Sequence, residues 1–186
     1  NDLLANLVIG PFILNSVQAY RVVHMKHHAR HGELDDSEHS YFHPLSIGFL
    51  LCALLGIHAL QVVRDRRRLL RASPRRAERN AEMWVIFAGL TMHGLLVLGG
   101  LWLGWIAAGI AWAIGVVGVY PFLGALRQLL EHRGPNARRG IDYAVERHGS
   151  YTRVFAGTAL ASLFGGADFD RHLLHHWDMR IPCGRL

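Results

Sequence analysis

The feature that most constrains the fold is an uncharged stretch, residues 83–126, which runs for 44 residues without one Asp, Glu, Lys or Arg. A helix crosses the hydrocarbon core of a bilayer with about 20 residues, so this stretch is long enough for two spans. Its middle, residues 99–105, holds three glycines, which permit a tight reversal, and two tryptophans, which suit a membrane interface. We therefore predict an all-α integral membrane protein with a transmembrane helical hairpin over residues 83–126.

The composition agrees with a membrane protein. Hydrophobic residues make up 51% of the 186 residues and charged residues only 18%, and the apolar residues come in blocks rather than dispersed. This length allows one domain, and we expect residues 1–186 to form a single membrane domain. Cys52 and Cys183 are far apart in sequence and have no metal-ligand spacing, so we expect neither a thiolate site nor a disulfide framework.

The basic residues mark the ends of the hairpin. All 20 Lys and Arg lie outside residues 83–126, with eight arginines in residues 64–79 and four in residues 127–139. The positive-inside rule places these flanks in the cytoplasm. Basic runs can also bind nucleic acid. Here they adjoin apolar spans and lack interleaved aromatic residues, so we expect a collar that faces lipid headgroups and no nucleic-acid partner.

Three other segments are apolar but give weaker signals for a span. Residues 3–23 are interrupted by Pro11 and several polar residues, which predicts a partly inserted or protein-buried helix. Residues 45–63 form an uncharged run of 19 residues, long enough to cross a bilayer, although Gly56 and His58 weaken it. Residues 154–166 are short and predict an amphipathic helix at the membrane surface.

Two histidine clusters indicate a metal site. Residues 24–28 and residues 172–176 both read H-x-x-H-H, and they hold six of the thirteen histidines. Positions three and four apart share one face of a helix, so each cluster directs three imidazoles toward one point. Imidazole binds Fe, Zn, Cu or Ni. One cluster alone is compatible with accident or with surface histidines, but the same pattern near both ends of the chain favours a shared metal site.

A shared metal site also limits the topology. The two clusters must lie on one side of the membrane, so an even number of spans must separate them. The hairpin over residues 83–126 supplies two spans, and residues 45–63 are therefore expected to form a re-entrant or interfacial segment. The fold class that follows is all-α, with a membrane hairpin, interfacial or re-entrant helices, and a cytoplasmic cap rich in histidine.

With these residues in view, the chain resembles the membrane-bound fatty acid desaturases and their hydroxylase and ketolase relatives. Residues 24–28, followed by the acidic residues 35–38, are similar to the second histidine box of that family. Residues 127–132 resemble the segment with its additional histidine after the last span. Residues 172–176 resemble its third histidine box. The motifs occur in the family's order and cover nearly the whole chain.

One motif of the family is missing. Its first box, an H-x3–4-H pair, does not occur upstream of His24, and residues 1–4 are similar to the segment that follows that box. We therefore expect the sequence to be truncated at its N-terminus. It would then lack two ligands and at least one span, and it would be inactive by itself.

The resemblance implies a centre of two iron ions at the cytoplasmic membrane face, with O2 as co-substrate. It implies a lipid acyl substrate that is desaturated, with electrons from ferredoxin or a cytochrome b5-type carrier and its reductase. A hydroxylase or ketolase of a lipid or carotenoid is the alternative. A membrane protein that binds metal without catalysis is a more distant one. Carried over by position, the ligands are His24, His27, His28, His132, His172, His175 and His176.

Chemistry supports this interpretation independently. Cleavage of an alkyl C–H bond is beyond any side-chain acid or base, so it requires a redox metal and oxygen. Ligand type alone leaves Zn, Cu and Ni open. A zinc hydrolase would more often show H-E-x-x-H, which is absent, and transporter ligands are expected inside the spans. Ligating histidines usually donate their second N–H to a carboxylate or carbonyl, and the candidate carboxylates are Asp36, Glu131, Asp168, Asp170 and Asp178.

The other histidines carry less specific expectations. His31 lies near the first cluster and either supports it or lies on the surface. His58 and His93 stand in apolar segments, where a buried, hydrogen-bonded histidine and a functional one are both compatible with the sequence. His148 lies in a polar segment and is predicted to be exposed to solvent.

Overall fold

The computed structural model describes residues 1–38, 40–72, 76–143, 145–153 and 172–178, and these ranges contain helices and no strand. The chain divides into two compact units. The first contains Asn1–Met25 and Ile47–Leu123, and the second contains Lys26–Ser46 and Gly124–Leu186. The all-α prediction is confirmed for the described residues, whereas the amphipathic helix expected at residues 154–166 lies outside them.

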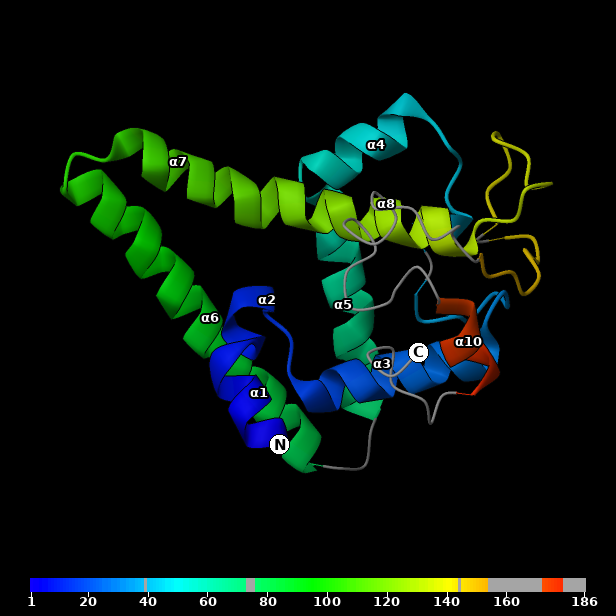
Figure 1. Cartoon of the computed structure of the whole chain (residues 1–186), viewed down its shortest axis with the longest axis horizontal. Helices are drawn as coiled ribbons and strands as arrows, with labels where there is room; N and C mark the ends of the chain where they lie inside the picture. The colour runs from blue at the N-terminus through cyan, green and yellow to red at the C-terminus, as the bar shows by residue number, and fades with distance from the viewer. Residues whose placement is uncertain (39, 73–75, 144, 154–171, 179–186) are drawn as a thin grey trace. The chain divides into compact units, whose positions relative to one another are not determined.

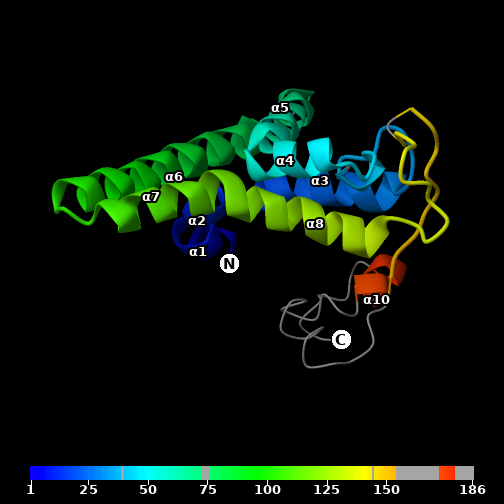
Figure 2. The ribbon, with the colours of Figure 1, turned by 90° about the horizontal axis from the view of Figure 1, so that it is seen from above.

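The predicted hairpin is the main feature of the first unit. Its arms are α6 (Arg76–Trp102) and α7 (Ile106–Ile114), which lie side by side in Figures 1 and 2. The second arm continues through η2 (Gly115–Val119), a π-helix, into α8 (Tyr120–His132). Arg79–Trp102 and Ile106–His132, of 24 and 27 residues, are long and apolar enough to cross a membrane. Two candidate spans therefore arise where the uncharged stretch predicts them.

The turn of the hairpin lies within the predicted residues 99–105. Gly104 has φ +80°, a left-handed conformation that a residue without Cβ adopts at little cost. The N–H of Trp105 donates a 2.8 Å hydrogen bond to the carbonyl of Gly100 and closes the end of α6. A Cβ added to Gly100 would lie 3.3 Å from the Cα of Gly109. Glycine is therefore needed here both for the turn and for the close approach of the arms.

Residues 3–23 form three helices where the sequence predicts one. Pro11 stands in the first turn of α2, where its missing N–H is tolerated, and Leu14 ends that helix with φ 50°. The side-chain oxygen of Asn6 accepts a 2.8 Å hydrogen bond from the N–H of Val17 and caps the next helix. Local turn geometry thus overrides the apolar pattern. The three helices are α1 (Asp2–Val8), α2 (Gly10–Ile13) and α3 (Val17–Arg30).

Residues 45–63 are bent rather than straight. They contribute α4 (Ile47–Leu54) and the start of α5 (Ile57–Ala72), and these helices meet at 73°. Gly56 forms the corner with φ +76°, and a Cβ there would lie 2.5 Å from the carbonyl oxygen of Val117 in η2. Such a bend occurs in a re-entrant loop and in a broken span. The expected re-entrant or interfacial placement is compatible with it and stays a prediction.

A buried ion pair connects α5 and α6 in the first unit. Arg66 on α5 lies 2.8 Å from Glu82 on α6, with side chains 12% and 4% exposed. Glu82 also accepts a 2.9 Å hydrogen bond from the N–H of Ser16, and Arg66 donates one of 2.8 Å to the carbonyl of Leu14. Arg66 therefore departs from the solvated collar expected of residues 64–79, because it serves as a connector between helices.

Replacing Arg66 with methionine should destabilise the protein by about 3–5 kcal/mol, because it leaves the Glu82 carboxylate buried without its cation. The measurement is the midpoint of thermal unfolding in detergent. Arg68→Met on the same helix is the matched control, since the Arg68 side chain is 63% exposed and pairs with Asp65 at 3.4 Å. It should change stability by at most about 0.5 kcal/mol. Equal midpoints for the two variants would contradict a connecting role for Arg66.

The second unit is built around the end of α8. The loop after α3 contains a short helix, η1 (Ser40–Phe42), whose three residues are all buried. Arg133 joins this loop to the segment after α8, since its guanidinium donates to the carbonyls of Tyr41 and His43 at 2.7 Å and of Arg138 at 2.8 Å. The last described helix of this unit is α10 (His172–Trp177).

Candidate metal centre

Both histidine clusters lie on helices, as their spacing predicts. The first lies in α3, and the second is nearly the whole of α10. His132 is the last residue of α8. Within the second unit, these three elements supply all of the predicted ligands except His24, which stands on α3 one turn before His28 and belongs to the first unit. A role for His24 therefore stays a prediction.

Three histidines from the three helices converge in the second unit. His27, His132 and His176 each offer one nitrogen, and these nitrogens lie within 4.8 Å of one another. The ring centroids are 4.8 Å apart for His27 and His132, 5.2 Å for His27 and His176, and 4.9 Å for His132 and His176. The fold thus gathers imidazoles that are far apart in sequence.

The remaining predicted ligands adjoin this group. The Nε2 atoms of His28 and His175 are 3.1 Å apart, and so are the Nε2 atoms of His172 and His176. Two nitrogens that bind one metal ion at about 2.1 Å and at right angles lie roughly 3 Å apart. The separations within the cluster therefore suit ligand atoms around metal.

The hydrogen bonding of His132 indicates whether its ring is suited to bind a metal ion. The side chain is fully buried, and its Nδ1 lies 3.2 Å from the carbonyl oxygen of Tyr151, so Nδ1–H donates to that carbonyl. With the proton on Nδ1, Nε2 carries a lone pair, and among the described residues it has no hydrogen-bond partner. A buried polar atom without a partner is costly. A metal-bound imidazole with its other nitrogen held by a carbonyl accounts for this arrangement.

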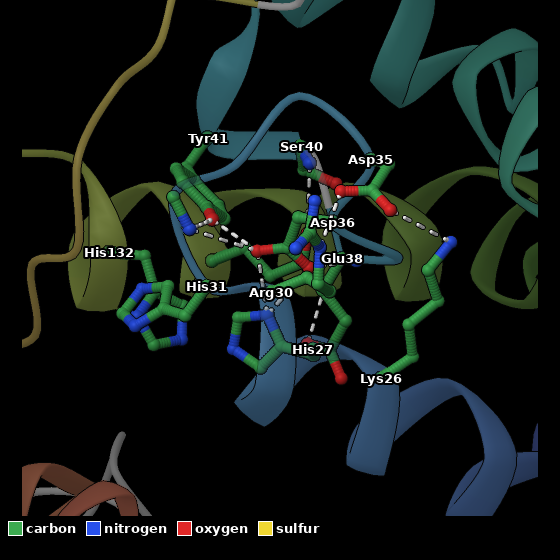
Figure 3. Close-up of polar contacts among 12 residues, drawn as sticks. Lys26, His27, Arg30, His31, Asp35, Asp36, Glu38, Ser40, Tyr41 and His132 are labelled. Atoms are coloured by element: carbon green, nitrogen blue, oxygen red, sulfur yellow. Dashed lines mark hydrogen bonds and ion pairs between the residues drawn. The ribbon is translucent and has the colours of Figure 1, made fainter.

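Asp36 holds His27 in a similar way (Figure 3). The Asp36 carboxylate lies 2.8 Å from Nδ1 of His27, and it also accepts from the Tyr41 hydroxyl and from the N–H of Glu38 at 2.9 Å. Burial lowers the pKa of His27, but the bond with Asp36 and the negative charges of Glu38 and Asp36 together outweigh it and raise that pKa. A carboxylate in this position orients a ligating histidine. Its role beside a metal stays a prediction.

For His31 the sequence left open whether the ring supports the cluster or lies on the surface, and the structure places it beside the cluster. Its ring centroid lies 4.9 Å from that of His27, 4.5 Å from that of His132 and 4.8 Å from that of His176, and Figure 3 shows it beside His132. Burial, with the nearby charge of His27, lowers the pKa of His31 to about 4, so the ring is neutral at pH 7. Its spacing of four residues from His27 was the signal that could have found it.

Among the predicted carboxylate partners, Glu131 is buried, with a carboxylate oxygen 3.8 Å from Nε2 of His172. Asp178 lies just after α10, where its N–H donates a 3.1 Å hydrogen bond to the carbonyl of Leu174. Asp168 and Asp170 lie outside the described residues.

Two other histidines have clear structural partners. The prediction that His148 is exposed was wrong, because the loop after α8 folds back, so that the ring is half-buried against Tyr41 and accepts a 3.3 Å hydrogen bond from the N–H of Gly134. His93 is buried in the first unit, where it lies 3.2 Å from the carbonyl of Phe12 and accepts a 3.1 Å bond from Trp112. His93 thus follows the buried, hydrogen-bonded alternative.

The family model described as fatty acid desaturase matches the chain over residues 1–186. Comparison with curated proteins and with solved structures gave no match.

Proposed function

The chain belongs to the fatty acid desaturase family, and from that premise we propose that it acts in the O2-dependent desaturation of a lipid acyl chain at a histidine-ligated di-iron centre. The observation that carries this proposal is the convergence of His27, His132 and His176, whose ligand atoms lie within 4.8 Å of one another. A fully buried His132 nitrogen without a hydrogen bond is the strongest sign that an ion belongs there.

The proposed ligands are those expected from the sequence. When bound, the two iron ions and O2 supply the oxidising power that breaks unactivated C–H bonds. The overall reaction converts two adjacent methylene groups, O2, two electrons and two protons into a double bond and two water molecules. The ligand set is His24, His27, His28, His132, His172, His175 and His176.

The residues around the proposed ligands orient their rings and shield them from water. Asp36 holds Nδ1 of His27 and the Tyr151 carbonyl holds Nδ1 of His132, so each ring would bind an ion through Nε2, with the ion in place of any proton there. The buried side chains of Tyr41 and Phe42 exclude water from this side of the cluster. Water exclusion strengthens the electrostatic interactions of the site and protects it from side reactions.

The arginine-rich segments bear on the side of the membrane and on the electron donor. We place the histidine cluster on the cytoplasmic side, because the arginine-rich flanks of the two candidate spans follow the positive-inside pattern. The exposed arginines of α5 suit an acidic electron carrier such as ferredoxin or a cytochrome b5-type protein. They suit anionic lipid headgroups equally. The exposed set on that helix is Arg64, Arg67, Arg68 and Arg71.

Lipid profiling tests the proposal. The protein that the complete gene encodes would be expressed in membranes with a reducing system, and its lipids compared with those of an empty-vector control. We expect a new acyl double bond that requires O2, and about two iron ions per protein, as a di-iron centre needs. A hydroxylated or ketonic product would favour the alternative reactions on the same scaffold. Zinc in place of iron, with no oxidised lipid, would overturn the proposal.

A further inference from the structure

Two buried carboxylates in the second unit have different surroundings. Asp36 is fully engaged in hydrogen bonds, including the one of 2.8 Å to Nδ1 of His27. Glu131 is equally buried, with a side chain 3% exposed, yet its Oε2 forms no hydrogen bond with any residue that the structure describes. That oxygen lies 3.6 Å from Nε of Arg127 and 3.8 Å from Nε2 of His172. The carboxylate is therefore directed toward the histidine cluster without bonding to it.

We propose that Glu131 is itself a metal ligand, in a group with His132 and His172. The inference rests on the proposed function, since it assigns Glu131 to the same metal centre. The three residues are buried, and their ligand atoms lie within 4.8 Å of one another. Ligand atoms bound to one ion at about 2.1 Å lie roughly 3–4 Å apart, whereas a carboxylate that orients a histidine lies within hydrogen-bond distance, about 2.7–3.2 Å. The 3.8 Å separation from His172 matches the first case.

Charge gives an independent reason. A carboxylate with almost no exposed surface is costly unless it is paired or bound to metal. Arg127 compensates it only in part, because that side chain is 39% exposed and forms no hydrogen bond to Oε2. A divalent cation at this position would satisfy the carboxylate and the buried Nε2 of His132 together.

The ligand types also suit the chemistry. Two histidines and one carboxylate form the set with which non-haem Fe(II) oxygenases bind iron while leaving positions open for other ligands. His132 belongs both to this group and to the group with His27 and His176, so the two groups adjoin. The carboxylate would thus make one position of the centre different from the other, whose ligands are imidazoles alone.

The test counts iron and records its spectrum in the protein that the complete gene encodes. Wild type should hold about two iron ions with two distinct Mössbauer components, and Glu131→Gln should hold about one and lose one component, because a neutral amide is a poor ligand beside imidazole and carboxylate. Asp36→Asn is the comparison. It should keep both components at saturating iron and show only a weaker affinity, about 10–100-fold.

The outcomes separate the two proposals. If wild type holds two irons and Glu131→Gln holds two with an unchanged spectrum, Glu131 is not a ligand and the proposed function stands. If wild type holds no iron, both proposals fall. The wild-type spectrum also tests the inference without depending on the folding of a variant. A single Mössbauer component, from two equivalent irons, would overturn it. Melting of the metal-free proteins checks the variant, because removal of a buried charge should leave Glu131→Gln at least as stable as wild type in that form.

Discussion

Replacing His132 with alanine should abolish both iron retention and product formation. His132 is fully buried at the end of α8, and it is common to both groups of candidate ligands. The substitution removes the imidazole that the two groups share, and alanine offers no ligand atom in its place. We expect activity to fall by more than about 100-fold, beyond the range typical of residues that only orient a ligand. Iron content by mass spectrometry and lipid profiling measure the two effects.

The control is a histidine of the same unit outside both groups. His148→Ala removes the acceptor of the Gly134 N–H and part of the packing on Tyr41. It should lower the melting temperature slightly but keep iron and product. Full activity in His132→Ala, or complete loss of iron in His148→Ala, would mean that the metal centre lies elsewhere.

The second large effect is expected for Asp36→Ala. Besides holding His27, Asp36 accepts from Tyr41 and from the N–H of Glu38, so its loss leaves several buried donors without a partner. Each such group costs about 1–3 kcal/mol. His27 also loses the bond that fixes its proton on Nδ1, and iron affinity should fall by about 10–100-fold. A chelator titration measures the affinity, and thermal unfolding measures the stability.

The neighbouring acid provides the matched control. Asp35 has a side chain 53% exposed and pairs with Arg30 at 2.8 Å on the surface. A surface ion pair contributes about 0–1 kcal/mol, so Asp35→Ala should leave iron affinity unchanged and stability nearly so. Similar losses in the two variants would show that the acidic loop acts by its overall charge and not through the bond between Asp36 and His27.

The sequence was most informative where a single physical requirement dominates. A stretch of 44 residues without charge is typical of paired membrane spans, so the hairpin and its turn within residues 99–105 could be located from the sequence alone. The helical spacing of the histidines likewise predicts which rings share a face. In both cases the signal is local and periodic, and tertiary contacts do not alter it.

What sequence reasoning missed depends on contacts between distant segments. Arg66 reads as one more solvated arginine, and only its packing against Glu82 makes it a buried connector. Leu14 gives no sign of its left-handed conformation, which divides the N-terminal helix. His148 was assigned to solvent because its neighbours in sequence are polar. These features arise from chain segments that meet only in the fold.

The distance along the chain between His28 and His175 has a consequence for biosynthesis. These residues are 147 positions apart, yet their Nε2 atoms lie 3.1 Å from each other. At a synthesis rate of roughly 5–20 residues per second, the ribosome needs on the order of ten seconds to add the later partner. During that interval the nascent polypeptide would have only part of the proposed ligand set. The proposed iron centre could therefore take up its full set of ligands only after α10 has been synthesised.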